Sequence, residues 1–124
     1  MPRDAAVPDR RRQLGAAGED AAQRWYEARG YEIIDRNWRV REGEIDLVVR
    51  HGSTVVFCEV KTRSSDRYGA PVEAITATKQ RRLRTLAARW FAEHPGQRGP
   101  VRFDVASVLP AGAEPTVDVI EAAF

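Results

Sequence analysis

Residues 44–61 read EIDLVVRHGSTVVFCEVK, two runs rich in β-branched residues that flank the short segment His51-Gly52-Ser53. β-branched residues favour extended strands, and a short glycine-containing connection between two such runs is typical of a β-hairpin. The segment therefore predicts two antiparallel strands, residues 44–50 and 54–61, joined by a turn at Gly52.

Charged side chains occupy matching positions on the two strands of this hairpin. In a hairpin that turns at Gly52, residues whose numbers sum to about 105 lie opposite each other. Asp46 should then face Glu59, and Glu44 should face Lys61, within about one residue of register. Because side chains alternate between the two faces of a strand, Glu59 and Lys61 point the same way. We therefore expect two carboxylates and an ammonium group close together on one face of an apolar sheet.

Two carboxylates crowded on an apolar sheet repel each other and lose hydration, so the pair costs stability unless a ligand compensates. A divalent cation removes the conflict, because magnesium and related cations prefer carboxylate oxygens as ligands. Lys61 is then placed to stabilise charge on a phosphate oxygen or to help activate an attacking water. The alternative is a structural ion pair, either Glu59 with Lys61 or Asp46 with an arginine at the sheet edge.

The rest of the chain predicts one α/β domain preceded by a short arm. Residues 1–12 contain two prolines and few large apolar side chains, which indicates a flexible basic arm. Residues 13–124 form a single domain in which helical and strand-like apolar patterns follow one another. The expected elements outside the hairpin are helices over 13–29 and 78–94 and strands over 31–40, 101–109 and 116–120, with a loop at 64–71 and a turn at 110–112.

Both predicted helices carry polar residues toward the hairpin. Glu19 lies at the boundary of the apolar face of the first helix, from which it can overhang the sheet edge. The alternative for Glu19 is an ordinary exposed position near the helix start, favourable to the helix dipole. Lys79 and Gln80 flank the direction of Leu83 at the start of the second helix, and helix N-termini attract phosphate. The second helix is therefore expected to pack on the sheet and to present its first turn to a phosphate group.

Composition excludes several classes of protein. Hydrophobic residues make up 43% of the chain and charged residues 31%, which is ordinary for a globular domain. No apolar run approaches the roughly 20 residues that span a bilayer, and no secretory signal is visible. A single cysteine, Cys58, forms no internal disulfide, and with only two histidines it argues against structural zinc. We expect a cytoplasmic protein with no membrane partner.

Basic residues are concentrated rather than numerous, since the net charge is only +2. Arginine clusters interleaved with tryptophan suit a phosphate-rich partner, although solvated helix faces explain each cluster equally well. Trp38 and Trp90 themselves are better explained as core or sheet-edge aromatics than as base-stacking platforms. Cys58 is expected to be a small buried residue and not a nucleophile. Asp104 either approaches the hairpin site or caps a sheet edge.

Motifs along residues 13–109 also match a known family. They are Gly18-Glu19, Gly30-Tyr31, Arg36-Asn37-Trp38-Arg39, Gly43-Glu44-Ile45-Asp46-Leu47, Phe57-Cys58-Glu59-Val60-Lys61-Thr62-Arg63, Gly69-Ala70-Pro71, Glu73-Ala74, Lys79 and Arg102-Phe103-Asp104-Val105. In this order they resemble the YraN-like family of small bacterial proteins. That family is similar to the PD-(D/E)xK nuclease superfamily and to Holliday-junction resolvases. The superfamily's proline before the aspartate is replaced here by Ile45.

The resemblance implies a restriction-endonuclease-like fold, a mixed β-sheet core flanked by helices. It assigns metal binding to Asp46 and Glu59, with Glu19 contributing from the first helix, and the catalytic lysine role to Lys61. It also implies a cofactor, Mg²⁺ or Mn²⁺. Lys79 or Gln80 matches a polar residue that some branches add from the following helix.

The function that follows is a metal-dependent nuclease that hydrolyses phosphodiester bonds in DNA, with branched or single-stranded DNA as candidate substrates. The alternative is a non-catalytic nucleic-acid binding module on a nuclease fold, with arginines supplying salt-dependent affinity. A homodimer is expected only by analogy with junction-cutting relatives. The residues expected to contact nucleic acid are Lys79, Gln80, Arg36, Arg39, Arg63 and Arg81.

Overall fold

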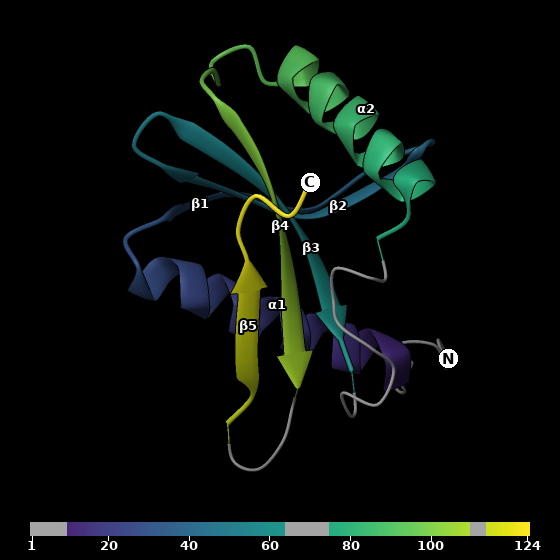
Figure 1. The fold of residues 1–124 in the computed structure, drawn as a ribbon, viewed down its shortest axis with the longest axis vertical. Coiled ribbons are helices and arrows are strands. Elements are labelled where there is room, and N and C mark those ends of the chain that lie inside the picture. The colour runs from purple at the N-terminus through teal and green to yellow at the C-terminus, as the bar shows by residue number, and fades with distance from the viewer. Residues whose placement is uncertain (1–9, 64–74, 110–113) are drawn as a thin grey trace, which may run out of the picture.

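The computed structural model describes residues 10–63, 75–109 and 114–124. Its elements follow the predicted order of one helix, three strands, a second helix and two strands (Figure 1). They are α1 Arg10–Ala28, β1 Glu32–Val40, β2 Gly43–His51, β3 Thr54–Thr62, α2 Ala77–Glu93, β4 Val101–Leu109 and β5 Thr116–Ile120. The predicted α/β class, a restriction-endonuclease-like mixed sheet flanked by helices, is confirmed.

The five strands form one mixed sheet in the order β1-β2-β3-β4-β5. Neighbouring strands are antiparallel except β3 and β4, which run parallel. Parallel neighbours need a crossover connection, and α2 lies in that connection on one face of the sheet. Helix α1 covers the other face, so the described molecule has three layers (Figure 1).

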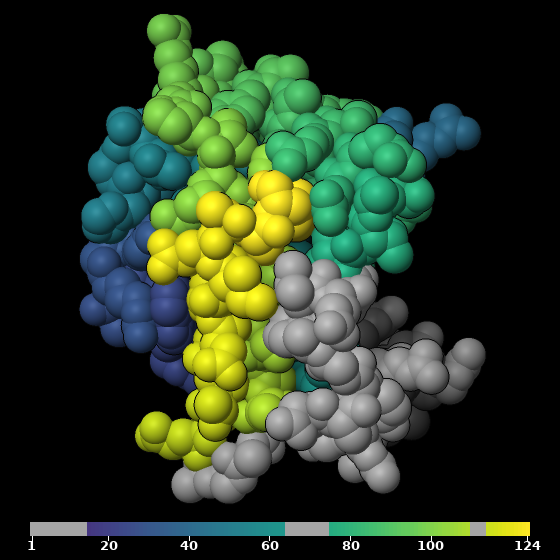
Figure 2. Space-filling view, viewed as in Figure 1, coloured from purple at the N-terminus to yellow at the C-terminus, as the bar shows by residue number. Residues whose placement is uncertain are grey.

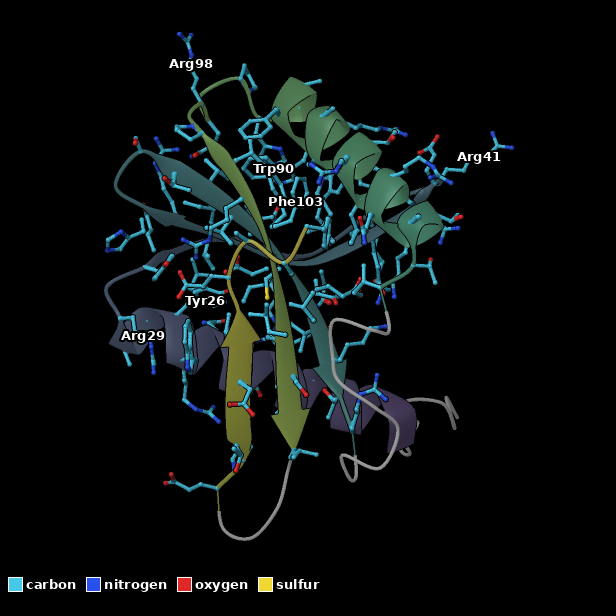
Figure 3. The ribbon with its side chains drawn as sticks, viewed as in Figure 1. Tyr26, Arg29, Arg41, Trp90, Arg98 and Phe103 are labelled. Atoms are coloured by element: carbon cyan, nitrogen blue, oxygen red, sulfur yellow. The ribbon has the colours of Figure 1, made fainter. Side chains whose placement is uncertain are left out.

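Each face of the sheet has its own apolar core. Beneath α2, the fully buried Trp90 packs edge-on against Phe57, which stacks on Phe103 (Figure 3). Beneath α1, Tyr26 belongs to the buried cluster that includes Cys58. Burying one large apolar side chain contributes roughly 1.5–3 kcal/mol, so these two clusters fix both helices on the sheet.

Cys58 and Trp38, which the sequence predicts to serve packing, do so. Cys58 is buried beneath α1, and burial raises the pKa of its thiol. Trp38 packs at the margin of the α2 core. Phe124 stacks on Phe103 with ring centroids 5.2 Å apart, and the Arg84 guanidinium lies over both rings. Figure 2 shows the C-terminal segment in yellow lying against α2 in green.

Asp104 does not reach the hairpin site; it ties α1 to β4 and to the C-terminus. Its side chain is fully buried and accepts a 2.6 Å hydrogen bond from the Tyr26 hydroxyl. The Arg102 guanidinium donates to both carboxylate oxygens at 2.9 Å. The backbone N–H of Ala122 donates to Oδ1 at 3.1 Å. A buried carboxylate with this many donors is fully compensated, which makes Asp104 a structural anchor.

The main difference from the predicted boundaries is at the first helix. Helix α1 begins at Arg10, three residues before the predicted start, and so takes in the end of the predicted arm. Residues 1–9, the predicted loop at 64–71 and the predicted turn at 110–112 lie outside the described residues. Among the helices that the structure describes, neither is long and apolar enough to cross a membrane.

Candidate metal centre

The candidate site lies where β2 and β3 separate. Their paired residues run from His51 opposite Thr54 to Leu47 opposite Cys58, which confirms the predicted register around Gly52. Beyond that point β2 continues its pairing with β1, whereas β3 continues its pairing with β4. A fork therefore opens between the two central strands, and its first residues are Asp46 and Glu59.

Glu44 does not follow the prediction that it faces Lys61. In the structure Glu44 is the register partner of Arg39 on β1 and accepts a 2.8 Å hydrogen bond from the Arg39 side chain. The reason is that β2 leaves β3 after Leu47, so the pairing rule that holds near the turn no longer applies. The same divergence frees the space into which the Asp46 carboxylate turns.

Asp46 is held in the fork by the backbone of β3. The N–H of Val60 donates a 2.8 Å hydrogen bond to Asp46 Oδ2, replacing a strand–strand bond with a side-chain one. Burial and the nearby Glu59 carboxylate together raise the pKa of Asp46 to about 8, against the smaller opposing effect of the Val60 hydrogen bond. The charge of Glu19 adds a smaller contribution to the shift in the same direction. Asp46 and Glu59 thus lie close together in a partly desolvated site, as the sequence predicted.

Two lysines converge on the same acids. Lys79 Nζ, from the first turn of α2, lies 3.5 Å from Glu59 Oε2. Burial is the largest cause that lowers the pKa of Lys61, and contact with Lys79 adds to it. The structure therefore places the predicted residues Asp46, Glu59, Lys61 and Lys79 in one cluster between β2, β3 and α2.

Glu19 approaches this cluster from α1 but is not part of a closed ligand set. Its side chain is 15% exposed, and its Oε1 lies 3.5 Å from Arg36 Nε. Within the described ranges, no three histidine, cysteine or carboxylate side chains lie close enough together to hold a metal. The arrangement is a two-carboxylate centre with Glu19 near enough to influence the charge on Asp46.

Gly18 sets how closely Glu19 approaches. A β-carbon at Gly18 would collide with Thr62 Oγ1 and lie 3.1 Å from Thr62 Cβ, so α1 rests directly on the end of β3. Sequence reasoning missed this contact. The available signal was a glycine inside a predicted helix, which costs about 1 kcal/mol relative to alanine unless packing requires it.

Gly18→Ala should therefore destabilise the protein by about 1–3 kcal/mol, because the added methyl overpacks the α1–β3 contact. Gly15→Ala is the matched control, since nothing lies within 4 Å of a β-carbon there. Alanine at position 15 should stabilise the protein by about 0.5–1 kcal/mol through helix propensity alone. Urea denaturation followed by circular dichroism measures both. Equal effects at the two positions would contradict the close approach.

Three of the other residues expected to contact nucleic acid, Arg36, Gln80 and Arg39, have partners in the protein. Arg36 bridges β1 to α1, donating to Asp20 at 2.7 Å and to the Ala16 carbonyl at 3.2 Å. Gln80 donates to the Ile75 carbonyl at 3.3 Å, in the turn before α2. Arg39 is paired with Glu44, as described above. These contacts make Arg36 and Gln80 structural elements of the site's surroundings.

Arg63 and Arg81 differ in their surroundings. Arg63 follows β3 directly, and its Nε is buried without a hydrogen-bond partner among the described residues. Arg81 is exposed on α2, where its guanidinium donates to Thr78 Oγ1 at 3.3 Å. Arg41, at the tip of the β1–β2 hairpin, extends away from the molecule (Figure 3). Arg41 and Arg81 are the clearest examples of exposed arginines.

The fold and the forked acidic site define the class of the protein, a restriction-endonuclease-like α/β protein with a candidate metal centre between its central strands. The chain belongs to the UPF0102 family, because the sequence model of this uncharacterised protein family matches its residues 18–108. This confirms the YraN-like resemblance.

Relatives from three bacteria illustrate the similarity. A UPF0102 protein of Clavibacter michiganensis is 51% identical, covering 92% of this chain and 98% of the relative. A UPF0102 protein of Frankia casuarinae is 55% identical, covering 90% of this chain and 95% of the relative. A UPF0102 protein of Beutenbergia cavernae is 57% identical, covering 77% of this chain and 81% of the relative. Their names state the family and no activity.

Proposed function

We propose that this protein is a metal-dependent nuclease that hydrolyses phosphodiester bonds. The observation that carries the proposal is the Asp46–Glu59 pair, held at the strand fork beside Lys61 and Lys79. Two neighbouring carboxylates that are partly buried on a sheet are unfavourable in the folded protein, and a bound cation would compensate their charge. Two ammonium groups next to them suit an anionic substrate.

The donor set fits magnesium or manganese. Both are bound through hard oxygen ligands, and magnesium usually uses one or two carboxylates and keeps several waters. Asp46 and Glu59 would hold the ion, with the Val60 carbonyl as a neighbouring oxygen and Glu19 acting through water. When bound, such an ion activates water and polarises a phosphoryl oxygen. Among the described residues only these two carboxylates converge, which is compatible with this mode because water would fill the remaining positions.

The chain's own residues supply the other needs of phosphodiester hydrolysis. Lys61 is oriented by β3 toward the acid pair and would donate to the phosphate oxygen that gains charge. The lowered pKa of Lys61 also suits exchange of a proton with water. The first turn of α2 lies at the same place, capped by Thr76, whose hydroxyl accepts from the Lys79 N–H at 3.1 Å. The dipole of a helix also favours an anion such as phosphate near the helix start.

The proposed substrate is DNA, as the family resemblance implies. The exposed Arg81, on α2 two residues after Lys79, would add a sequence-independent contact to the DNA backbone. Structure specificity toward branched or single-stranded DNA is tested with a panel of supercoiled, linear, single-stranded, branched and RNA substrates. Binding without cleavage of any substrate would favour the non-catalytic binding module instead.

Lys61→Met tests the proposed chemistry. Removing one preorganised donor to a developing oxyanion typically costs about 10²–10³ in kcat, and we expect a loss of this size. Manganese binding should be unchanged or slightly stronger, since Lys61 is not a ligand. Arg98→Met is the control with the same change in charge, because Arg98 lies beyond the opposite end of β3 (Figure 3). Full cleavage by Lys61→Met would refute the role of this lysine.

A further inference from the structure

Lys79 holds Glu59 in the arrangement that the structure describes. The 3.5 Å separation of Lys79 Nζ and Glu59 Oε2 joins side chains that are only 31% and 13% exposed. Water therefore screens this pair less than it screens the exposed ion pairs of the surface. An oxygen of a proposed metal ligand is thus occupied by an internal cation.

The backbone around Lys79 keeps that cation in place. Thr76 caps α2 by accepting from the Lys79 N–H, and Gln80 fastens the same turn by donating to the Ile75 carbonyl. The main chain of the first turn is fixed on both sides of the residue. The lysine side chain itself is a flexible four-carbon stem that ends in a compact point charge. Its ammonium can leave Glu59 without any change in the helix.

A divalent ion and the Lys79 ammonium cannot both take the same place beside Glu59. They are like charges, and Lys61 adds a third cationic group at the same cluster. An ion that takes Glu59 Oε2 as a ligand displaces Lys79 from that oxygen. The displaced ammonium remains within a side chain's length of the site, where a phosphate is the available anion.

We propose that Lys79 is a positioning residue that couples metal binding to phosphate binding. It neutralises Glu59 when no metal is bound, and it turns to the substrate phosphate when the metal takes its place. This inference rests on the proposed nuclease function and adds a feature to it: metal alone binds weakly, and metal and nucleic acid strengthen each other's binding. By thermodynamic linkage the strengthening is the same in both directions.

A purely structural Lys79 makes a different prediction. A structural ion pair would lose some stability on Lys79→Met, and metal affinity would stay unchanged or weaken as the site loosened. A competing Lys79 requires the opposite sign, because its removal leaves Glu59 free for the metal. The sign of the change in metal affinity therefore separates the two roles.

The experiment is calorimetric titration of Mn²⁺ into the full chain without nucleic acid. We expect Lys79→Met to bind Mn²⁺ about tenfold more tightly than the wild type, within the range of typical coupling between sites. Arg98→Met, which removes the same charge at the opposite end of β3, should match the wild type. Lys79→Gln gives the same test if Lys79→Met folds poorly. Unchanged or weaker Mn²⁺ binding in the Lys79 variants overturns the proposal.

A second measurement tests the coupling itself. Fluorescence anisotropy of a labelled DNA oligonucleotide, with Ca²⁺ and then with a chelator, gives the gain in DNA affinity caused by the cation. The wild type should show a clear gain, and Lys79→Met should lose most of it; an equal gain in both contradicts the proposal. If neither protein binds Mn²⁺ at all, the proposed metal centre fails as well. If both bind it equally, only the role of Lys79 fails.

Discussion

Asp46→Asn should make the metal-free protein more stable while removing its affinity for divalent cations. Asparagine keeps an oxygen for the Val60 N–H, and its amide can donate to Glu59 without the proton that Asp46 must take up to lie beside that carboxylate. A hydrogen bond to a charged group contributes about 1.5–3 kcal/mol, and we expect a gain near the lower value because the site is partly exposed. The same substitution removes one charged ligand from the metal centre.

The extra stability of Asp46→Asn over the metal-free wild type should grow as pH rises. The folded protein holds the Asp46 proton up to a pH of about 8, whereas the ordinary value is 3.8. Between these values the folded state binds more protons than the unfolded chain, so the wild type loses stability as pH rises. Asp46→Asn has no such proton, and its free energy of unfolding should fall less over the same range. Glu59, Glu19, Lys61 and Lys79 surround Asp46 in both proteins, which keeps the comparison matched.

Urea denaturation at several pH values, in the presence of a chelator, measures this difference. Adding Mn²⁺ should then stabilise the wild type and leave Asp46→Asn unchanged, because a ligand stabilises only the state that binds it. Asp118→Asn, an exposed carboxylate on β5, is the control. A wild type that is more stable than Asp46→Asn at high pH without metal would contradict the strained acid pair.

Asp104→Ala should produce the largest loss of stability. It would leave the buried Tyr26 hydroxyl and the Arg102 guanidinium without their shared acceptor. Breaking a buried ion pair by removing one partner costs about 3–5 kcal/mol, and we expect about 3 because Arg102 is partly exposed. Thermal denaturation of Asp104→Ala and the wild type measures this loss of stability.

Asp118→Ala provides the comparison for Asp104→Ala, since it deletes a carboxylate of the same length from the exposed face of β5. It should change stability by less than about 0.5 kcal/mol. Similar melting temperatures for the two variants would show that the Tyr26–Asp104–Arg102 network contributes little. Any effect of Asp104→Ala on cleavage should follow its unfolding, because Asp104 lies outside the strand fork.

The sequence predicted the hairpin well because its register is a local property. The turn at Gly52 fixes which residues face each other, and five observed pairs follow that rule. The point at which β2 and β3 stop pairing, after Leu47 and Cys58, was not predictable in the same way. It depends on the competing partners of β2 and β3, and those are chosen by strands β1 and β4 elsewhere in the chain.

Partner choice over long distances explains the remaining differences. Arg36 pairs with Glu19 and Asp20 because α1 packs across β1, and its position in the sequence does not predict these partners. The sequence allows two roles for Asp104, and the hydrogen bond from Tyr26, 78 positions away, decides between them. Residue patterns identify which side chains are unusual, whereas the packing of the helices decides which of them meet.

Cleavage of DNA by the wild type and by Asp46→Asn, with Mg²⁺ and with a chelator, tests the central claim most directly. The variant retains the fold by the argument above, so the comparison isolates the metal centre. We predict fragments from the wild type with Mg²⁺ and from no other combination, across at least one substrate of the panel. Equal cleavage by the two proteins, or no cleavage of any substrate by the wild type, would contradict a nuclease site at the strand fork.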